Sequence, residues 1–368
     1  MWRLTENRNR AGLKQKFSWV RDMEGVPQDA IHHAEGDVAT HTRMVTQSLL
    51  TLHEYQLLDE QNQEILWVSA LMHDIEKRST TVIESDGRIT SAGHAKKGEK
   101  TTRTILYCDV PTPFIVREQI AKLVRYHGLP LWIFEKSNPQ KALLEASLEV
   151  NTELLTMLAK ADVLGRICAD QEELLYKIEL FKAFCQEQGV WGKAKRFPSN
   201  LAKFNYFQKE DESPDYEPFE EESFEVIMMS GIPGAGKDTY LKKYHKDLTI
   251  ISLDDIRRKH GISPTDKSGN GRVVQMAKEM AREFLRKKQP FAWNATNTSR
   301  QMREQLIRLF TTYGAKIKII YLEVPFKKLM SQNRNREYAV PESVLLKLIE
   351  RLEIPTDSEG HEVVRIVE

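Results

Sequence analysis

The stretch that decides the fold is Gly231-Ile232-Pro233-Gly234-Ala235-Gly236-Lys237-Asp238-Thr239, which follows the apolar run Val226-Ile227-Met228-Met229. A strand that ends in a glycine-rich turn and opens a helix presents backbone N–H groups and a positive helix end to one small volume. That volume suits the phosphates of a nucleotide. The stretch matches G-x-x-x-x-G-K-[ST] except that Asp238 stands at the last place. The cofactor-binding residues predicted from it are Gly231, Gly234, Gly236, Lys237, Asp238 and Thr239.

Lys237 places a positive charge where the β- and γ-phosphates of a nucleotide lie. At the place of Asp238 a hydroxyl usually binds magnesium. Thr239, one residue on, could supply that hydroxyl, or Asp238 could hold the ion directly or through water. We therefore expect ATP or another nucleoside triphosphate, with Mg²⁺, as the cofactors of this site.

Length and composition bound the class of protein. The chain has 368 residues, more than one core usually supports, so two domains are expected. Charged residues make up 29% and balance to a formal +1, so any nucleic-acid-binding surface must be local. The cysteines, Cys108, Cys168 and Cys185, are odd in number and lack metal-site spacing. No signal peptide and no long apolar span is recognised, so a cytoplasmic protein without a membrane segment is predicted.

An acidic segment marks the predicted domain boundary. Residues 208–223 are rich in Glu and Asp around Pro214 and Pro218 and have almost no aliphatic side chains. Such a segment cannot bury enough apolar surface to order itself. We therefore predict a helical domain over residues 1–207, this linker, and a domain over 224–368 that alternates strands and helices. The expected fold is all-α followed by α/β, with a parallel sheet and a helical lid.

Histidines and acids gather in the first domain. Seven of the ten histidines precede Gly128, and imidazoles and carboxylates are ligands for transition metals. Adjacent His73 and Asp74, at the end of a helical stretch, can serve one metal ion or a bridged pair. Lys77 lies one helical turn after His73, on the same face. A metal site of this kind lowers the pKa of bound water and polarises a phosphoryl oxygen, which phosphoester hydrolysis needs.

The order His41, His73-Asp74, His94, His127 and Asp162 resembles the ligand set of the two-metal HD phosphohydrolases. The surrounding motifs, His-x-Glu-Gly-Asp-Val-x-x-His-Thr and Gly-His-x-x-x-Gly, resemble those of the HD domain attached to transfer-RNA nucleotidyltransferases. The resemblance covers about residues 25–190. It implies two divalent ions, and imidazole and carboxylate ligands admit manganese, nickel, cobalt, iron or zinc. It also implies core ligands His41, His73, Asp74 and Asp162, second-metal ligands His94 and His127, and phosphate contacts His33, Lys77 and Arg166.

In the second domain, acidic residues follow the expected strand at 248–253. Carboxylates at the carboxyl end of a parallel strand lie at the rim where ligands bind. Asp254 is therefore a candidate general base for an acceptor hydroxyl, and Arg257, about one turn on, can hold an acceptor phosphate. The alternative is that Asp254 caps the next helix, with Asp255 in its first turn.

Further strands are expected at 290–297, which has a polar exit, and at 316–324. A helix after Pro325 leads to a polar stretch with Arg334 and Arg336, and another helix runs to about Leu352. Two arginines between helices suit a mobile lid that closes over phosphates.

Together these features resemble the 5′-hydroxyl polynucleotide kinases of phage and bacterial repair systems, over about residues 224–353. That resemblance implies that Asp254 is the general base and that the lid arginines act in catalysis. The residues to which it gives roles are Lys237 and Thr239 for ATP, Arg257 and Asn297 for substrate, and Arg334 and Arg336 in the lid.

The whole chain resembles the bacterial HD-domain polynucleotide kinase-phosphatases. The resemblance implies hydrolysis of 2′,3′-cyclic phosphate, 3′-phosphate or 2′-phosphate ends by the first domain, and ATP-dependent phosphorylation of a 5′-hydroxyl end by the second. Its expected partners are RNA or DNA ends, a nucleoside triphosphate and a nucleic-acid ligase acting downstream. Two alternatives are a metabolic nucleoside kinase fused to an HD nucleotidase, and a nucleotide sensor without catalysis.

Overall fold

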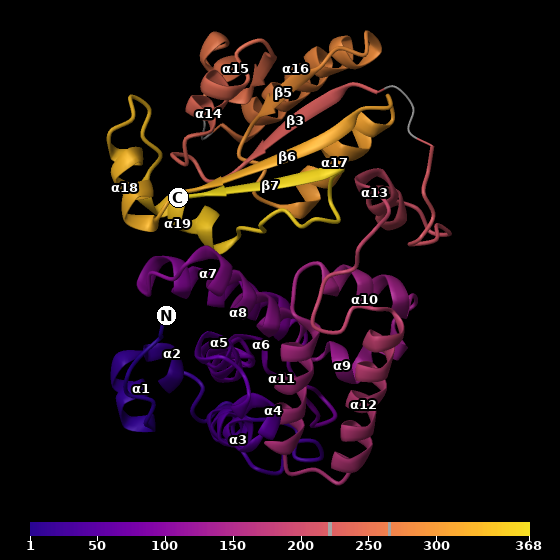
Figure 1. The fold of residues 1–368 in the computed structure, drawn as a ribbon. Coiled ribbons are helices and arrows are strands. Elements are labelled where there is room, and N and C mark those ends of the chain that lie inside the picture. Colours follow the sequence, from indigo (N-terminus) through magenta and orange to yellow (C-terminus); the bar gives the residue numbers. More distant parts are fainter. Residues whose placement is uncertain (220–222, 264–265) are drawn as a thin grey trace. The chain divides into compact units, whose positions relative to one another are not determined.

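The computed structural model describes residues 1–219, 223–263 and 266–368. The described chain divides into two compact units, Met1–Lys195 and Arg196–Glu368. Figure 1 shows the helices and strands of each.

The division lies earlier than the predicted end of the first domain at residue 207. Helix α13 (Asn200–Gln208) belongs to the second unit, because Phe204 is buried in that unit's core and stacks on His361 at a ring-centroid distance of 3.9 Å. The predicted linker therefore begins after a packed helix. Its residues 220–222 lie outside the described part of the chain.

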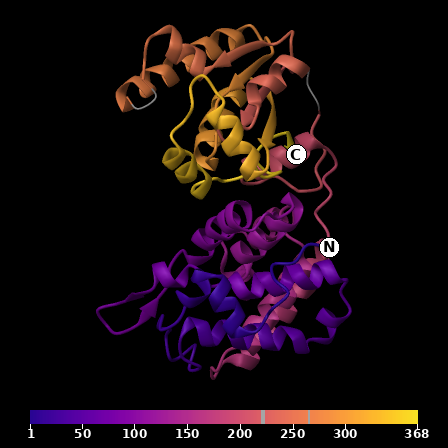
Figure 2. The same ribbon diagram turned by 90° about the vertical axis from the view of Figure 1, so that its left-hand side faces the viewer.

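The first unit is built of helices, as predicted (Figure 2). It also contains a short antiparallel hairpin that the sequence analysis did not predict, β1 (Val82–Ile83) with β2 (Ile89–Thr90). A π-helical turn, η1 (Ile105–Asp109), and a 3₁₀ turn, η2 (Ile133–Glu135), complete it. The helices are α1 (Arg10–Lys16), α2 (Ser18–Arg21), α3 (Val38–Thr51), α4 (His53–Gln56), α5 (Glu60–Met72), α6 (Lys77–Thr80), α7 (His94–Thr104), α8 (Phe114–Tyr126), α9 (Leu129–Trp132), α10 (Pro139–Ser147), α11 (Thr152–Leu164) and α12 (Gln171–Glu187).

Helices α5 and α11 form the centre of this unit. Residues 64–72 of α5 are all buried, as is most of α11, and helices that are apolar on all sides belong in an interior. Both begin at a good N-cap: the Asp59 carboxylate accepts two backbone N–H groups of α5, and the Asn151 side chain does the same for α11. The carboxyl end of α5 therefore delivers the residue that follows it, His73, into the interior.

The second unit is built on a parallel sheet in the order β4-β5-β3-β6-β7. The first four of these strands in chain order were predicted from the sequence, and β7 was not. In the register, Met228 of the central strand lies beside Trp293 on one side and Ile319 on the other. The strands are β3 (Glu225–Ser230), β4 (Thr249–Ser252), β5 (Phe291–Asn294), β6 (Lys316–Glu323) and β7 (Glu362–Val367).

Helices pack against this sheet, with α16 contacting β4 and α17 contacting β6 (Figure 1). The fold class predicted for this part, an α/β fold with a parallel sheet, is confirmed. No helix in the described ranges is long and apolar enough to cross a membrane. The helices of the unit after α13 are α14 (Lys237–Tyr244), α15 (Leu253–Lys259), α16 (Lys267–Arg286), α17 (Arg300–Thr311), α18 (Phe326–Arg334) and α19 (Glu342–Glu350).

A buried ion pair fastens the end of the chain to this unit. Arg303 of α17 bonds both carboxylate oxygens of Glu359, at 2.6 and 2.8 Å, and both side chains are almost fully buried. Arg303 also donates to the backbone carbonyls of Asn297 and Glu353. Because Glu359 lies just before β7, the pair holds the segment that leads into the last strand.

Candidate active sites

Three imidazoles in the first unit are oriented in the same way. His73, His94 and His127 each donate Nδ1–H to the backbone carbonyl three residues earlier, at 2.8 Å in each case. This hydrogen bond fixes the tautomer and leaves each Nε2 atom with a lone pair. Such an Nε2 atom is a ready metal ligand.

Four atoms that can bind a metal ion converge at the carboxyl end of α5. His41 Nε2 lies 3.0 Å from Asp162 Oδ1, 3.4 Å from His73 Nε2 and 3.7 Å from Asp74 Oδ2. His73 Nε2 lies 3.2 Å from Asp74 Oδ2 and 3.9 Å from Asp162 Oδ1. An ion with ligand bonds of about 2.0 to 2.2 Å places neighbouring donors roughly 3 Å or slightly more apart. The four residues therefore fit around one divalent cation.

The other oxygen of Asp74 faces a second set of atoms that can bind a metal ion. Its Oδ1 lies 3.3 Å from His94 Nε2 and 3.9 Å from His127 Nε2, and the two Nε2 atoms are 3.3 Å apart. Asp74 Oδ1 is buried and accepts no hydrogen bond from the described residues. A buried carboxylate oxygen without a donor needs a positive partner. The structure thus brings the six predicted ligands together as two sets that share Asp74, an arrangement that fits two divalent ions.

The predicted phosphate contacts lie beside these ligands. Lys77 Nζ is 2.8 Å from Asp74 Oδ2 and donates to Gln28 Oε1, also at 2.8 Å. Arg166 Nη2 is 2.5 Å from Asp162 Oδ2. The ring of His33 packs edge-on against that of His41, with centroids 4.7 Å apart. Two cations and an imidazole therefore border the metal-ligand set.

The electrostatics suit cation binding. Burial raises the pKa of Asp74 and Asp162, but the neighbouring charges outweigh it and hold both pKa values well below the usual range. For Asp74 these are the charges of His73 and Lys77, and for Asp162 the charge of Arg166. Burial, together with the charges of His94 and His73, lowers the pKa of His127 to about 3. The carboxylates are therefore ionised and His127 is neutral, the forms that bind metal ions.

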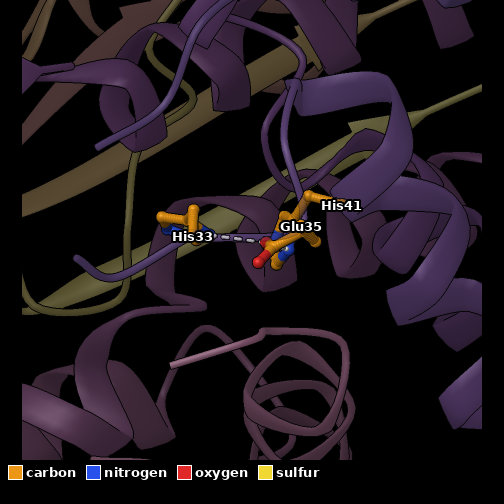
Figure 3. Close-up of side chains that lie close together, drawn as sticks. All are labelled: His33, Glu35 and His41. Atoms are coloured by element: carbon orange, nitrogen blue, oxygen red, sulfur yellow. Dashed lines mark hydrogen bonds and ion pairs between the residues drawn. The ribbon is translucent and has the colours of Figure 1, made fainter. Parts of the chain in front are cut away.

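One residue of this site was missed from the sequence. Glu35 Oε1 lies between two imidazoles, 2.9 Å from His33 Nδ1 and 2.8 Å from His41 Nδ1 (Figure 3). Its Oε2 accepts the backbone N–H of Ile167 at 2.9 Å. Burial raises the pKa of Glu35, but these partners outweigh burial and lower it to about 2. The signal in the sequence was the His33-x-Glu35 spacing just before α3, which carries no chemistry by itself.

In the second unit the phosphate-binding loop joins β3 to α14. Gly231, Gly234 and Gly236 have φ values of 142°, 93° and 94°, which an L side chain rarely adopts. Lys237 Nζ donates to the carbonyls of Gly231, at 2.8 Å, and Ile232, at 3.1 Å. Burial, and to a smaller extent the charge of Arg336, lowers the pKa of Lys237, whereas the charges of Asp238 and Asp254 raise it. The net result is a pKa of about 8. The Lys237 ammonium group therefore lies against the loop, where the phosphates of the nucleotide are predicted to bind.

A cavity of about 1080 Å³ lies over this loop. Its lining comes from the loop and the start of α14, from α15 and the residues after it, from α16, from the end of β5 and the residues after it, from α17, from the end of α18 and the segment that follows, and from α19. Within the described part of the chain, neither Gly231 nor Arg334 lines the cavity, so only Arg336 of the predicted lid arginines reaches it. The predicted site residues that line it are Gly234, Gly236, Lys237, Asp238, Thr239, Asp254, Arg257, Asn297 and Arg336.

Asp254 lies in the first turn of α15 rather than at its cap. Ser252 is the N-cap, since its Oγ accepts the backbone N–H of Asp255 at 3.2 Å. The alternative that Asp254 caps this helix is therefore wrong. Its carboxylate, 60% exposed, pairs with Arg257, whose Nε also donates to Asn270 Oδ1 at 2.7 Å.

Two asparagines, Asn294 at the end of β5 and Asn297 after it, make different contacts. Asn297 is buried with a φ of 43°, and its amide donates to the carbonyl of Met229 at 2.7 Å. Its side chain therefore fastens the turn after β5 to the end of β3. Asn294, which was not predicted, donates to Asp238 Oδ1 at 2.5 Å. It thus orients the carboxylate that replaces the usual hydroxyl of the loop.

Comparison with known families agrees with this division. A family model described as an HD domain matches residues 38–167, and a model described as an AAA domain, AAA_33, matches residues 226–355. The chain therefore carries an HD domain followed by a P-loop kinase domain. The two matches indicate an enzyme with hydrolase and kinase activity that uses a nucleoside triphosphate with Mg²⁺ and a divalent metal at the HD domain.

Several solved structures are similar to parts of the chain. The Pnkp1/Rnl/Hen1 complex is 19% identical over 34% of this chain and 44% of that one, with a TM-score of 0.30. A sugar kinase from Janibacter sp. is 17% identical over 40% of this chain and 86% of that one, with a TM-score of 0.31. A gluconokinase from Sinorhizobium meliloti is 18% identical over 40% and 84%, with a TM-score of 0.29. The match thus covers less than half the length of the chain of that complex.

Proposed function

We propose that this chain, which joins an HD domain to a P-loop kinase domain, prepares both ends of a broken RNA strand for ligation. The HD domain would hydrolyse 2′,3′-cyclic phosphate, 3′-phosphate or 2′-phosphate ends, and the kinase domain would transfer the γ-phosphate of ATP to a 5′-hydroxyl end. The observation that supports the proposal is that one chain holds clusters of His and Asp side chains that could bind metal ions and a cavity over the phosphate loop that Asp254 lines. The clusters suit phosphoester hydrolysis and the cavity suits phosphoryl transfer.

At the HD site, two divalent ions would polarise the phosphoryl oxygens of the ester and lower the pKa of water. The chain's own cations have a separate task. Lys77 and Arg166 border the ligand carboxylates and can balance the charge of the phosphate that enters. Water adds to phosphorus, the bond to the ribose 2′- or 3′-oxygen breaks, and the proton ends on that oxygen. Hydrolysis of the remaining monoester then releases inorganic phosphate.

At the kinase site, Lys237 and the loop N–H groups hold the β- and γ-phosphates. Asp254 accepts the proton of the acceptor hydroxyl while its oxygen forms a bond to the γ-phosphorus and the bond to ADP breaks. Arg257, paired with Asp254, can hold the phosphate of the acceptor strand. Arg336 reaches the same cavity and can stabilise the charge on the transferred group. Asp238, oriented by Asn294, is our candidate for the magnesium ligand.

Chemistry explains why the two activities belong together. A 2′,3′-cyclic phosphate needs a 2′-hydroxyl and therefore arises only from RNA. The partner end of such a break carries a 5′-hydroxyl, so neither end can be ligated until both are changed.

The cavity over the phosphate loop, at about 1080 Å³, is at the upper end of the size usual for small-ligand pockets, which leaves room for an acceptor beside ATP. A nucleic-acid ligase is accordingly the enzyme class that we propose acts next.

The proposal is tested with an RNA oligonucleotide that bears a 5′-hydroxyl and a 2′,3′-cyclic phosphate. The purified chain, ATP, Mg²⁺ and Mn²⁺ are added, and both ends are resolved by mass spectrometry. Conversion of both ends is expected. Turnover of mononucleosides and mononucleotides with no change to the oligonucleotide would instead support a metabolic enzyme. Binding of ATP and Mn²⁺ without any turnover would support a sensor.

A further inference from the structure

We propose that Glu35 is a positioning residue that couples the metal site to the phosphate contacts, by holding His41 and His33 with one carboxylate oxygen. The inference rests on the function proposed above for the HD site and adds a residue to it. Glu35 lies before residues 38–167, which the HD family model matches, and the role proposed for it rests on the contacts of its carboxylate.

His41 is held differently from the other imidazoles of the site. His73, His94 and His127 donate Nδ1–H to neutral backbone carbonyls. Facing His41 Nδ1, at 2.8 Å, is a carboxylate oxygen instead. A carboxylate beside the far nitrogen raises the basicity of an imidazole and fixes its orientation, which strengthens the bond from the other nitrogen to a metal ion. His41 should therefore depend on Glu35 for its strength as a ligand.

His33 depends on the same oxygen. Its Nδ1 lies 2.9 Å from Glu35 Oε1 (Figure 3), which leaves its Nε2 for a substrate oxygen. His33 and His41 stand nearly perpendicular, with ring planes 79° apart. Because both rings meet at one oxygen atom, a shift of that atom displaces a metal ligand and a phosphate contact together.

The Glu35 carboxylate is itself fixed in place. Its side chain is 0% exposed, and its second oxygen accepts the N–H of Ile167. The backbone N–H of Ala34 donates to the carbonyl of Ile167 at 2.9 Å, so two hydrogen bonds join this loop to the segment after α11. That segment directly follows the ligand Asp162 and the cation Arg166. Both oxygens of Glu35 are thus committed within the site.

The test uses the full chain, stripped of metal with EDTA, and compares Glu35→Gln with Glu35→Asp. The matched control is Glu118→Gln, a partly buried carboxylate of the same unit, which bonds Arg103 and Arg117 and none of the metal ligands. Three quantities are measured: the number and affinity of Mn²⁺ ions bound, by calorimetry; the melting temperature with and without Mn²⁺; and hydrolysis of the cyclic phosphate. The metal-free melting temperature, together with circular dichroism of the helices, reports whether the first unit of each variant is folded, and kinase activity serves only as a check on the second unit.

Glu35→Gln should bind Mn²⁺ roughly 10- to 100-fold more weakly than the wild type, as expected for loss of a partner behind a metal ligand. Glu35→Asp, which keeps the charge, should recover part of that affinity. Glu118→Gln should lower the metal-free melting temperature and leave Mn²⁺ affinity unchanged. His33→Ala should reduce hydrolysis with little change in Mn²⁺ affinity, because in this proposal His33 contacts the phosphate and His41 binds the metal ion.

Three results would overturn the proposal. The first is wild-type Mn²⁺ affinity in Glu35→Gln. The second is a lowered metal-free melting temperature with an unchanged increase on adding Mn²⁺, which would make Glu35 only structural. The third is binding of three ions by the wild type and two by Glu35→Gln, which would make Glu35 a ligand of a further metal. If the wild type hydrolyses no phosphate end but Glu35→Gln still weakens Mn²⁺ binding, the proposed function fails while the role of Glu35 toward His41 stands.

Discussion

Gly231 of the phosphate loop lies against the backbone of Leu322 in β6, so closely that a Cβ atom on Gly231 would be 2.5 Å from the Leu322 carbonyl oxygen. The residue also has a φ of 142°. The loop therefore leaves the sheet through a gap between β3 and β6 that admits only backbone. This contact, rather than any contact with the cavity, explains the first glycine of the motif.

Gly231→Ala should destabilise the second unit by at least about 2 kcal/mol, because it adds both a backbone clash and an unfavourable φ. Hydrogen exchange of the β3 and β6 amides in the full chain measures this. The matched control is Gly271→Ala in α16, where a Cβ meets no atom within 4 Å. That change should stabilise the helix by roughly 0.5 to 1 kcal/mol. Equal effects of the two substitutions would contradict the assignment.

Asp74→Ala should reduce hydrolysis of the cyclic phosphate by more than about 100-fold, because it removes an oxygen from both metal-ligand sets. Kinase activity should stay near the wild-type rate, since Asp74 belongs to the other unit. Both activities are measured on the same preparation. Loss of both from a folded protein would contradict a model with two independent sites.

Lys237→Ala and Asp254→Ala should have the reverse effect. Each should lower 5′-phosphorylation by at least about 100-fold, through loss of phosphate binding in one case and of the general base in the other. Hydrolysis at the HD site should not change. A plot of rate against ATP concentration separates the two: KM should rise most in Lys237→Ala, and kcat should fall most in Asp254→Ala.

Substitutions of Asp238 and Thr239 distinguish which of the two side chains binds magnesium. If Asp238, held by Asn294, is the ligand, Asp238→Ala should raise the Mg²⁺ concentration for half-maximal kinase activity by roughly 10-fold or more. Asn294→Ala should raise it less, and Thr239→Ala should leave it near the wild-type value. A large effect confined to Thr239→Ala would assign the ion to the hydroxyl.

His361 should make the second unit sensitive to acid. Burial, with the charges of Lys316 and Lys203, lowers the pKa of His361 from 6.5 to about 4. Between these values the unfolded chain binds a proton that the folded chain does not, so the free energy of unfolding should fall as the pH decreases from 6.5 to 4. The fall attributable to this residue is at most roughly 2 to 3 kcal/mol. His361 accepts the Ile317 N–H through Nδ1, an acceptor that Gln can replace.

The check on this prediction is the difference between wild type and His361→Gln in unfolding free energy across that pH range. Hydrogen exchange at β6 and β7 reports it for the second unit. The wild type should lose more stability than the variant below pH 6.5. Parallel curves would show that His361 is not the group responsible.

Short-range patterns in the sequence were enough for much of the chemistry. The phosphate loop is a continuous stretch, so its glycines and Lys237 can be read directly, and apolar runs indicate four of the strands. The predicted metal ligands lie far apart in the chain, from His41 to Asp162. They could still be recognised, because imidazole and carboxylate side chains bind metal ions and their order resembles that of a known ligand set. These features depend on residue type and local spacing, which a sequence displays.

Tertiary structure decided the rest. Strand β7 is an edge strand that pairs with β6, and the segment before it is held by the buried pair of Arg303 and Glu359, 56 residues apart. No local sequence pattern predicts such a pair. Glu35 and Asn294 entered the sites only because folding brought them beside His41 and Asp238. Their roles depend on which distant group each one meets, and that follows from the packing of helices and strands rather than from the residues' own chemistry. The sequence determines which groups can act as ligands, acids and bases, whereas the fold determines which neighbours orient them.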